Sequence, residues 1–147
     1  MSDARAVSTT LSYVLALAIA TVLITGIIVA GGSYVDSQRE QVIRDELTVT
    51  GQQLAADIER ADRLVRAADT DGDVTVRTNQ SSSNSVTGAP YRITLDSSTD
   101  TLVLNTTNPD VTVRVGLAVE TPLAERTILG GDVQVRYTGS KLEVRDV

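Results

Sequence analysis

The stretch "RAVSTTLSYVLALAIATVLITGIIVAGG", residues 5–32, decides the architecture of this chain. Its single charge is Arg5, and the next charged residue along the chain is Asp36. Between Leu11 and Ala30 only three hydroxyl side chains and one tyrosine interrupt an apolar run of twenty residues. As a helix this run covers about 30 Å, the thickness of the hydrocarbon core of a bilayer. The sequence therefore predicts a membrane-spanning helix.

Two tyrosines mark the ends of the predicted span. Tyr13 and Tyr34 lie about 32 Å apart along a helix, where the two interfaces of a bilayer attract aromatic side chains. Arg5 alone gives little orientation bias, because Arg39 and Arg44 lie beyond the span. A short N-terminal tail most simply stays in the cytoplasm. We therefore expect a single-pass cell-membrane protein with an extracellular C-terminal domain.

The span has three interpretations: a cleaved secretory signal, a permanent anchor, or an assembly segment that is trimmed just ahead of its apolar part. A secretory signal has an apolar region of about 7–15 residues, so a run of twenty is too long for one. The other two interpretations remain open on length alone.

Small residues recur along the span at intervals of four. This spacing lets helices approach closely in a membrane or a bundle, although small residues are also common in apolar helices. The predicted helix-packing positions are Ser8, Ser12, Ala16, Ala20, Gly26 and Ala30.

An amphipathic helix is predicted from Asp36 to Ala68, after a bend at Gly31-Gly32. Gly51 in its middle weakens it slightly. Its apolar stripe most simply covers a small sheet, but it could also line the core of a multi-chain assembly. The stripe consists of Ile43, Leu47, Leu54, Ile58, Ala61, Val65 and Ala68.

Beyond Asp69 the apolar period changes from that of a helix to two, which is typical of strands. We expect five or six short antiparallel strands, separated by a polar loop at 79–90 and an unassigned stretch at 118–131. The predicted strands are 73–78, 91–96, 101–106, 110–117, 132–138 and 141–146. The predicted fold is therefore α+β, a long N-terminal helix followed by a small antiparallel sheet. Its predicted segments are a leader (1–6), an apolar helix (7–35), an amphipathic helix (36–69) and a β-rich domain (70–147).

The composition of the chain argues against several classes of function. The net charge of −6 lies entirely beyond the apolar segment and would repel phosphate backbones, so nucleic-acid binding is not expected. Lys141 is the only lysine, and an acidic, lysine-poor chain is typical of salt-loving archaea, although drift in a small acidic protein gives the same balance. The chain has no cysteine and no histidine, which removes disulfides, thiolate chemistry and a serine–histidine–carboxylate triad. We expect no enzyme activity and no cofactor.

Two local motifs suggest ligands or modification. "DTDGD", residues 69–73, invites a calcium loop, but the sixth and twelfth positions are Val74 and Gln80 instead of glycine and glutamate. An acidic turn is the simpler interpretation, and no metal site is predicted. Asn79 and Asn105 each begin an N-glycosylation triplet and are candidate modification sites.

The stretch "RAVSTTLSYVLALAIATVLITG", residues 5–26, resembles the class III signal of archaeal type IV pilins and archaellins, particularly the haloarchaeal ones. The resemblance implies that a prepilin peptidase cuts after Ala6, with Arg5 as the basic residue ahead of the cut and Val7 as the first mature residue. It also implies that the apolar helices of many copies form the core of a surface filament. A separate ATPase and membrane platform would supply the energy of extraction.

The stretch departs from those relatives at two places. Thr9-Thr10 replaces a proline-containing start, and Leu11 stands where bacterial pilins carry a glutamate. These differences favour a minor or pilin-like subunit over a major one. The alternative is a permanently anchored envelope protein that presents a small binding domain outside the cell.

Overall fold

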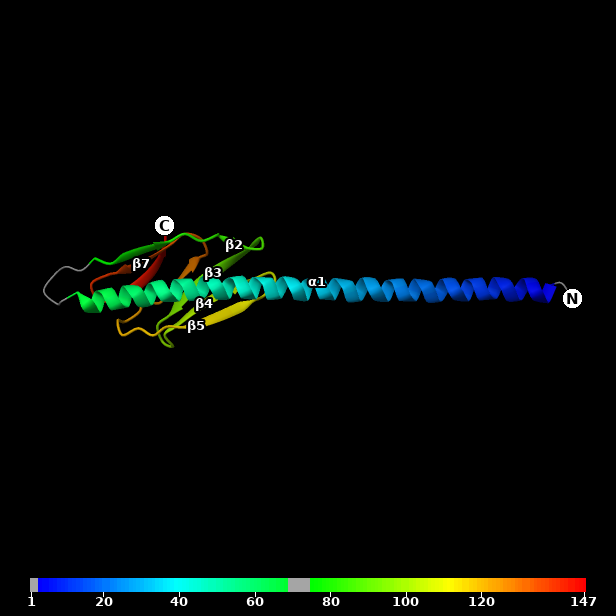
Figure 1. Cartoon of the computed structure of the whole chain (residues 1–147), viewed down its shortest axis with the longest axis horizontal. Coiled ribbons are helices and arrows are strands. Elements are labelled where there is room, and N and C mark those ends of the chain that lie inside the picture. Colours follow the sequence, from blue (N-terminus) through cyan, green and yellow to red (C-terminus); the bar gives the residue numbers. More distant parts are fainter. Residues whose placement is uncertain (1–2, 69–74) are drawn as a thin grey trace. The chain divides into compact units, whose positions relative to one another are not determined.

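The structure is a computed structural model that describes the backbone of residues 3–68 and 75–147, and their side chains from Thr10 onward. One helix, α1 (Asp3–Ala67), is followed by eight strands. The chain divides into two compact units, Met1–Arg39 and Glu40–Val147 (Figure 1). The predicted α+β fold, a long N-terminal helix and a small antiparallel sheet domain, is confirmed.

Helix α1 is continuous because nothing in its sequence stops it. The first proline of the chain is Pro90, so no residue of the helix lacks a backbone donor. The β-branched residues concentrated at 21–29 disfavour a helix by less than about 1 kcal/mol each. The expected bend at Gly31-Gly32 does not interrupt the helix, which is regular at both glycines. Arg66 lies in the last turn, where a positive charge complements the helix dipole.

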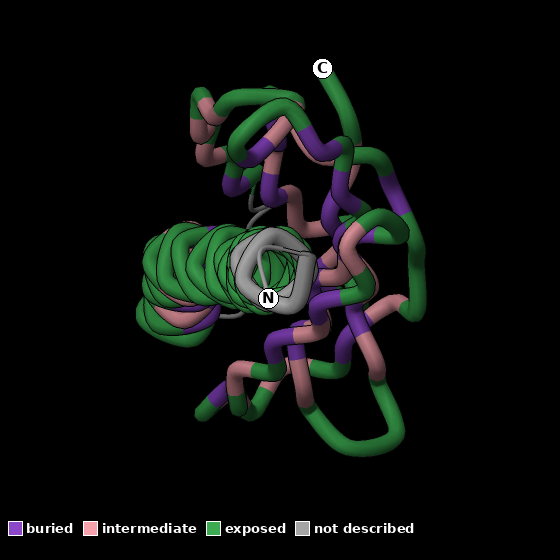
Figure 2. The backbone as a smooth tube through the Cα atoms, turned by 90° about the vertical axis from the view of Figure 1, so that its right-hand side faces the viewer, coloured by how far each residue is buried: buried purple, intermediate pink, exposed green. Residues whose placement is uncertain are grey.

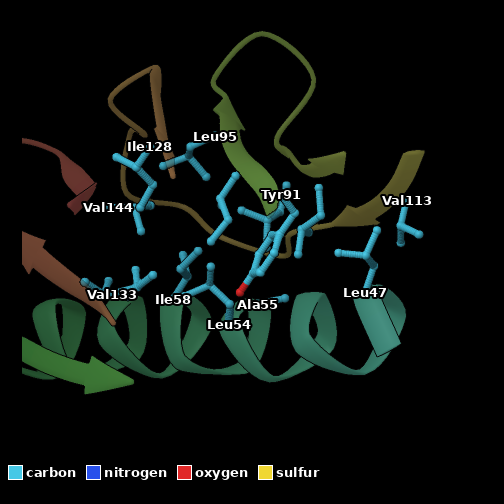
Figure 3. Packing of buried hydrophobic residues seen from close by; sticks show 14 of the residues in the cluster. Leu47, Leu54, Ala55, Ile58, Tyr91, Leu95, Val113, Ile128, Val133 and Val144 are labelled. Atoms are coloured by element: carbon cyan, nitrogen blue, oxygen red, sulfur yellow. The ribbon is translucent and has the colours of Figure 1, made fainter. Parts of the chain in front are cut away.

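The apolar stripe of α1 forms one side of the domain core. Ile43, Leu47, Ile58 and Ala61 are fully buried, and Leu54 is almost so. The stripe fades at its end, where Val65 and Ala68 are half-buried. Figure 3 shows the side chains of Leu47, Leu54 and Ile58 directed from the helix towards the strands. Of the two predicted roles for this stripe, covering the chain's own sheet is the one observed.

The strands form two antiparallel sheets. A three-stranded sheet has the order β1-β7-β8, and a five-stranded sheet has the order β2-β3-β4-β5 with β6 paired to β3. Figure 2 shows that together they curve around one side of the helix. The strands are β1 (Arg77–Gln80), β2 (Ser85–Val86), β3 (Ala89–Asp96), β4 (Thr101–Thr106), β5 (Thr112–Gly116), β6 (Arg126–Leu129), β7 (Val133–Tyr137) and β8 (Leu142–Asp146).

Alternation along the strands fills the other side of the core. In β3 every second residue is buried, from Ala89 to Leu95, and the intervening residues face outward. Tyr91 is the largest buried side chain, and its hydroxyl shares a 3.1 Å hydrogen bond with that of Ser82 (Figure 3). Gly130 lies against it, where any Cβ would overlap the tyrosine ring.

Two expectations about the strands were wrong, and the unassigned stretch contains a strand. The first strand begins at Arg77, not at residue 73, and continues into the stretch predicted as a loop. That loop, 79–90, also contains β2 and the start of β3, because Ser85 pairs with Pro90 in a short hairpin. The unassigned stretch 118–131 contains β6, which completes the free edge of β3. The polar composition of these segments concealed short strands, of which β1 and β6 pair with partners distant in sequence, whereas β2 pairs with the adjacent β3.

Gly51 brings the helix close to the sheet. A Cβ at this position would stand 3.0 Å from side-chain carbons of both Leu104 and Val115. The sequence suggested only a weak point in the helix, but the structure shows that the missing side chain makes room for β4 and β5.

We predict that Gly51→Val destabilises the full chain by about 1–3 kcal/mol, because its methyl groups would overlap the sheet. Gln52→Val, at the exposed neighbouring position, adds the same side chain to the same helix and is the matched control. Urea unfolding followed by circular dichroism in detergent measures both. Equal effects of the two substitutions would contradict the close approach at Gly51.

Candidate functional site

The apolar half of α1 is the most unusual surface of the chain. From Thr10 to Val35 every residue is exposed, including Val22 (72%) and Ile27 (71%). The helix is long and apolar enough to cross a membrane, with a mean hydropathy of 2.6 over its most apolar 18 residues. Exposed aliphatic side chains on this scale are unfavourable in water by about 25 cal/mol per Å². The chain is therefore a membrane-anchored protein with a C-terminal β domain.

Three of the hydroxyl groups on this half are bonded to the helix itself. Thr21 donates from Oγ1 to the carbonyl oxygen of Leu17 at 2.8 Å, and Thr25 donates in the same way to Thr21 at 2.9 Å. Ser33 donates to the carbonyl oxygen of Val29 at 3.3 Å. Because each of these three hydroxyl protons has a partner within the helix, these side chains can enter hydrocarbon without an unsatisfied donor.

The small residues form a stripe along this surface. At 100° per residue they fall within an arc of about 120°. Nothing lies within 4 Å of a Cβ built on Gly26, so the part of the chain that the structure describes does not occupy the stripe. The predicted processing residues Arg5, Ala6 and Val7, and Ser8 after them, lie in the first turns of α1. The packing and processing roles stay predictions.

A buried carboxylate joins α1 to the loop before β6. Asp62 is fully buried, and its Oδ1 accepts hydrogen bonds from the amides of Glu120 (3.3 Å) and Thr121 (2.9 Å). Its Oδ2 lies 3.0 Å from Nε of Arg66, which also reaches Glu120 at 2.8 Å. Burial disfavours the ionised carboxylate, but the hydrogen bonds from Thr121 and the Arg66 guanidinium hold the pKa of Asp62 below its ordinary value of 3.8.

Sequence reasoning missed Asp62. The available signal was its position, four residues after Ile58 and next to Ala61 on the apolar stripe, where a solvated aspartate would not be expected. Its role is structural, because both carboxylate oxygens have partners within the chain.

A shallow cleft of about 370 Å³ lies at the turn between β6 and β7. Its polar lining includes Ser82, Asn84, Asp132 and Asp146. Asp132 is already engaged, since its Oδ1 accepts from Ser81 Oγ at 2.6 Å and from the Ser82 amide at 3.2 Å. Over residues 3–68 and 75–147 no three acidic side chains gather closely enough to hold a metal ion.

The two glycosylation candidates lie in different settings. Asn79 is exposed on β1, with its Oδ1 accepting from Nε2 of Gln134 at 2.8 Å. Asn105 is half-buried on the outer side of β4, between Arg92 and Thr112 of the adjoining strands. The structure does not bring the two asparagines together. The acidic turn 69–73 lies outside the described residues.

A model of a family of unknown function, DUF7266, matches residues 2–145. No curated protein and no solved structure matches the chain. The matched region includes the apolar half of α1 as well as the β-rich domain, so the family model treats both as one unit.

We predict that Asp62→Asn lowers the free energy of unfolding at neutral pH by about 1–3 kcal/mol, because two amides and a guanidinium lose their charged partner. Since the folded pKa of Asp62 lies below 3.8, the contribution is present above that pH and is lost as the pH falls through the folded value. The wild type and the variant should therefore converge in acid.

Urea unfolding from pH 3 to pH 7 measures this convergence. Asp45→Asn, at an exposed helix position, serves as the control and should stay within about 0.5 kcal/mol of the wild type throughout. A constant difference between wild type and Asp62→Asn down to the lowest pH would contradict the assignment.

Proposed function

The chain belongs to the DUF7266 family, and we propose that it is a pilin-like subunit of an archaeal type IV pilus-like surface filament. It is inserted in the cell membrane and assembles through its N-terminal apolar helix. On this proposal it is a structural protein of a haloarchaeal envelope, and not an enzyme.

The observation that carries the proposal is the difference in burial between the two halves of α1. Its second half is covered by the chain's own sheets, whereas Thr10 to Val35 has no cover within the described residues. A helix of this kind can reside in a bilayer and can exchange lipid for the helices of other copies. Burying its aliphatic surface, at about 25 cal/mol per Å², would then stabilise a filament core without a nucleotide site in the subunit.

Assembly of this kind requires several partner proteins. A prepilin peptidase would cut after Ala6, and other copies or related subunits would pack along the small-residue stripe. Extraction from the bilayer would require a separate ATPase and membrane platform. The resemblance of residues 5–26 to class III signals supports these partners, and the hydroxyls bonded back to the helix suit both environments.

The second candidate is a permanent single-pass anchor that holds the domain outside the cell. A charged residue followed by an apolar helix, as at Arg5, is also common in single-span proteins, and this observation favours the anchor. An anchored protein would keep its N-terminal residues and remain with the membrane when surface fibres are sheared away.

N-terminal sequencing of the protein from native membranes and from sheared fibres distinguishes the candidates. A start at Val7 in material that pellets with fibres is the expected result. An intact start at Met1 or Ser2, confined to membranes, would favour the anchor. A start near Gly32 would identify a secretory signal and contradict both.

We predict that Ala16→Leu blocks assembly but not membrane insertion, because the larger side chain keeps neighbouring helices apart at the small-residue stripe. Ala18→Leu makes the same change on the opposite side of α1 and is the matched control. The measurement is the amount of each variant in membrane and sheared-fibre fractions. Normal assembly of Ala16→Leu would contradict the proposed packing face.

A further inference from the structure

Two surfaces of the unit Glu40–Val147 carry opposite charges, and no ion pair among the described residues neutralises them. The acidic side chains are exposed, whereas two of the three basic ones are half-buried. One, which we name the acidic strip, consists of Val42, Asp45, Glu46 and Val49 on α1. The other, the arginine face, consists of Arg77, Arg136 and Arg145 on the outer side of the three-stranded sheet. The four ion pairs among the described residues involve none of these seven side chains.

The acidic strip lies on the side of α1 opposite the buried stripe. At 100° per residue its four members fall within an arc of about 100°. Val42 and Val49 are 48% and 53% exposed and are seven residues apart, which places them in line on the helix. Asp45 and Glu46 flank that line and are also exposed. An apolar line with charged flanks resembles the core and rim of a protein interface.

The arginine face arises from the register of the sheet. Val133 and Val135 point into the core, so the alternate residues of β7 point outward. Arg77 on β1 stands directly opposite Arg136, and Arg145 on β8 stands opposite Gln134.

Like charges directly opposite one another destabilise a sheet. The one carboxylate on this outer side is Glu143, opposite Arg136, and its nearest guanidinium is that of Arg126 at 3.9 Å. The arginine face therefore keeps a net positive charge on a chain whose net charge is −6.

We propose that the arginine face of one copy binds the acidic strip of the next copy. Each copy carries both surfaces, so the contact is heterologous and can repeat without closing. Guanidinium groups pair well with carboxylates, and the aliphatic stems of the arginines can cover Val42 and Val49. The inference rests on the proposed function, in which copies meet, and names a contact between domains outside the apolar helix.

Cysteine cross-linking tests the contact, because the chain has no cysteine of its own. One copy carries Val49→Cys in the acidic strip, and a differently tagged copy carries Gln134→Cys beside Arg145. Oxidation in native membranes should give at least about tenfold more mixed dimer than Val49→Cys with Asn105→Cys on the other sheet, since a disulfide needs Cα atoms within about 7 Å.

Charge reversal then tests the chemistry of the contact. Asp45→Arg with Glu46→Arg in the first copy, or Arg136→Glu with Arg145→Glu in the second, should each lower the mixed-dimer yield about tenfold. Both reversals together should restore it to within about threefold of the unreversed pair, because the charges again have opposite sign. Arg114→Glu, an outward arginine of the five-stranded sheet, should leave the yield unchanged.

An unchanged yield after either reversal overturns the proposal. So does a loss that the second reversal does not restore, which would assign the arginines to another anionic partner. If the wild-type chain is found in sheared fibres but the Val49→Cys and Gln134→Cys pair gives no cross-link, this contact is contradicted and the proposed function stays intact. A cross-link in membranes of a chain absent from fibres keeps the contact and contradicts the filament.

Discussion

The close packing of α1 against its own two sheets is the interaction on which the domain depends. With no phenylalanine, tryptophan or cysteine, the core consists of aliphatic residues and Tyr91, and no disulfide assists them. Gly51 lets the helix approach β4 and β5, and the fully buried Asp62 secures the loop before β6 to the helix. The stability of such a small core depends more on close packing of its side chains than on the amount of apolar surface that it buries.

The two halves of α1 suit different environments, the first half lipid or other helices and the second half the domain core. Between residues 43 and 61 one face of the helix is buried by strands of the same chain. From Thr10 to Val35 the helix instead exposes mostly aliphatic side chains, and the hydroxyls of Thr21 and Thr25 are bonded to the helix itself. Such a helix needs lipid or other helices around its first half. This requirement connects the fold to the proposed role, since a subunit whose uncovered half can exchange lipid for neighbouring copies carries the driving force for assembly in its own sequence.

The distribution of charge over the domain bears on how neighbouring copies would contact one another. Acidic residues give the chain its negative net charge. The pairing register of β1, β7 and β8 nevertheless places three arginines on the outer side of the three-stranded sheet. Apolar contacts along α1 would set the strength of an assembly. Charged contacts between domains would set its register and would depend on salt concentration.

The sequence by itself determined the long helix, its apolar and amphipathic halves and the α+β order. It also determined five of the six predicted strands to within two residues, at 91–96, 101–106, 110–117, 132–138 and 141–146. These features follow from local periodicity, which is visible in one stretch of chain at a time. Only the tertiary structure decided that Gly51 is a contact point, that Asp62 is buried, and that β2 and β6 exist. Strand β2 pairs with its neighbour β3, but it has only two residues, too few to show a period. The other three features depend on a partner distant in sequence: Leu104 for Gly51, Thr121 for Asp62, and β3 for β6. The arginine face could not be predicted for the same reason, because Arg77 and Arg136 become neighbours only through pairing across 59 residues of chain.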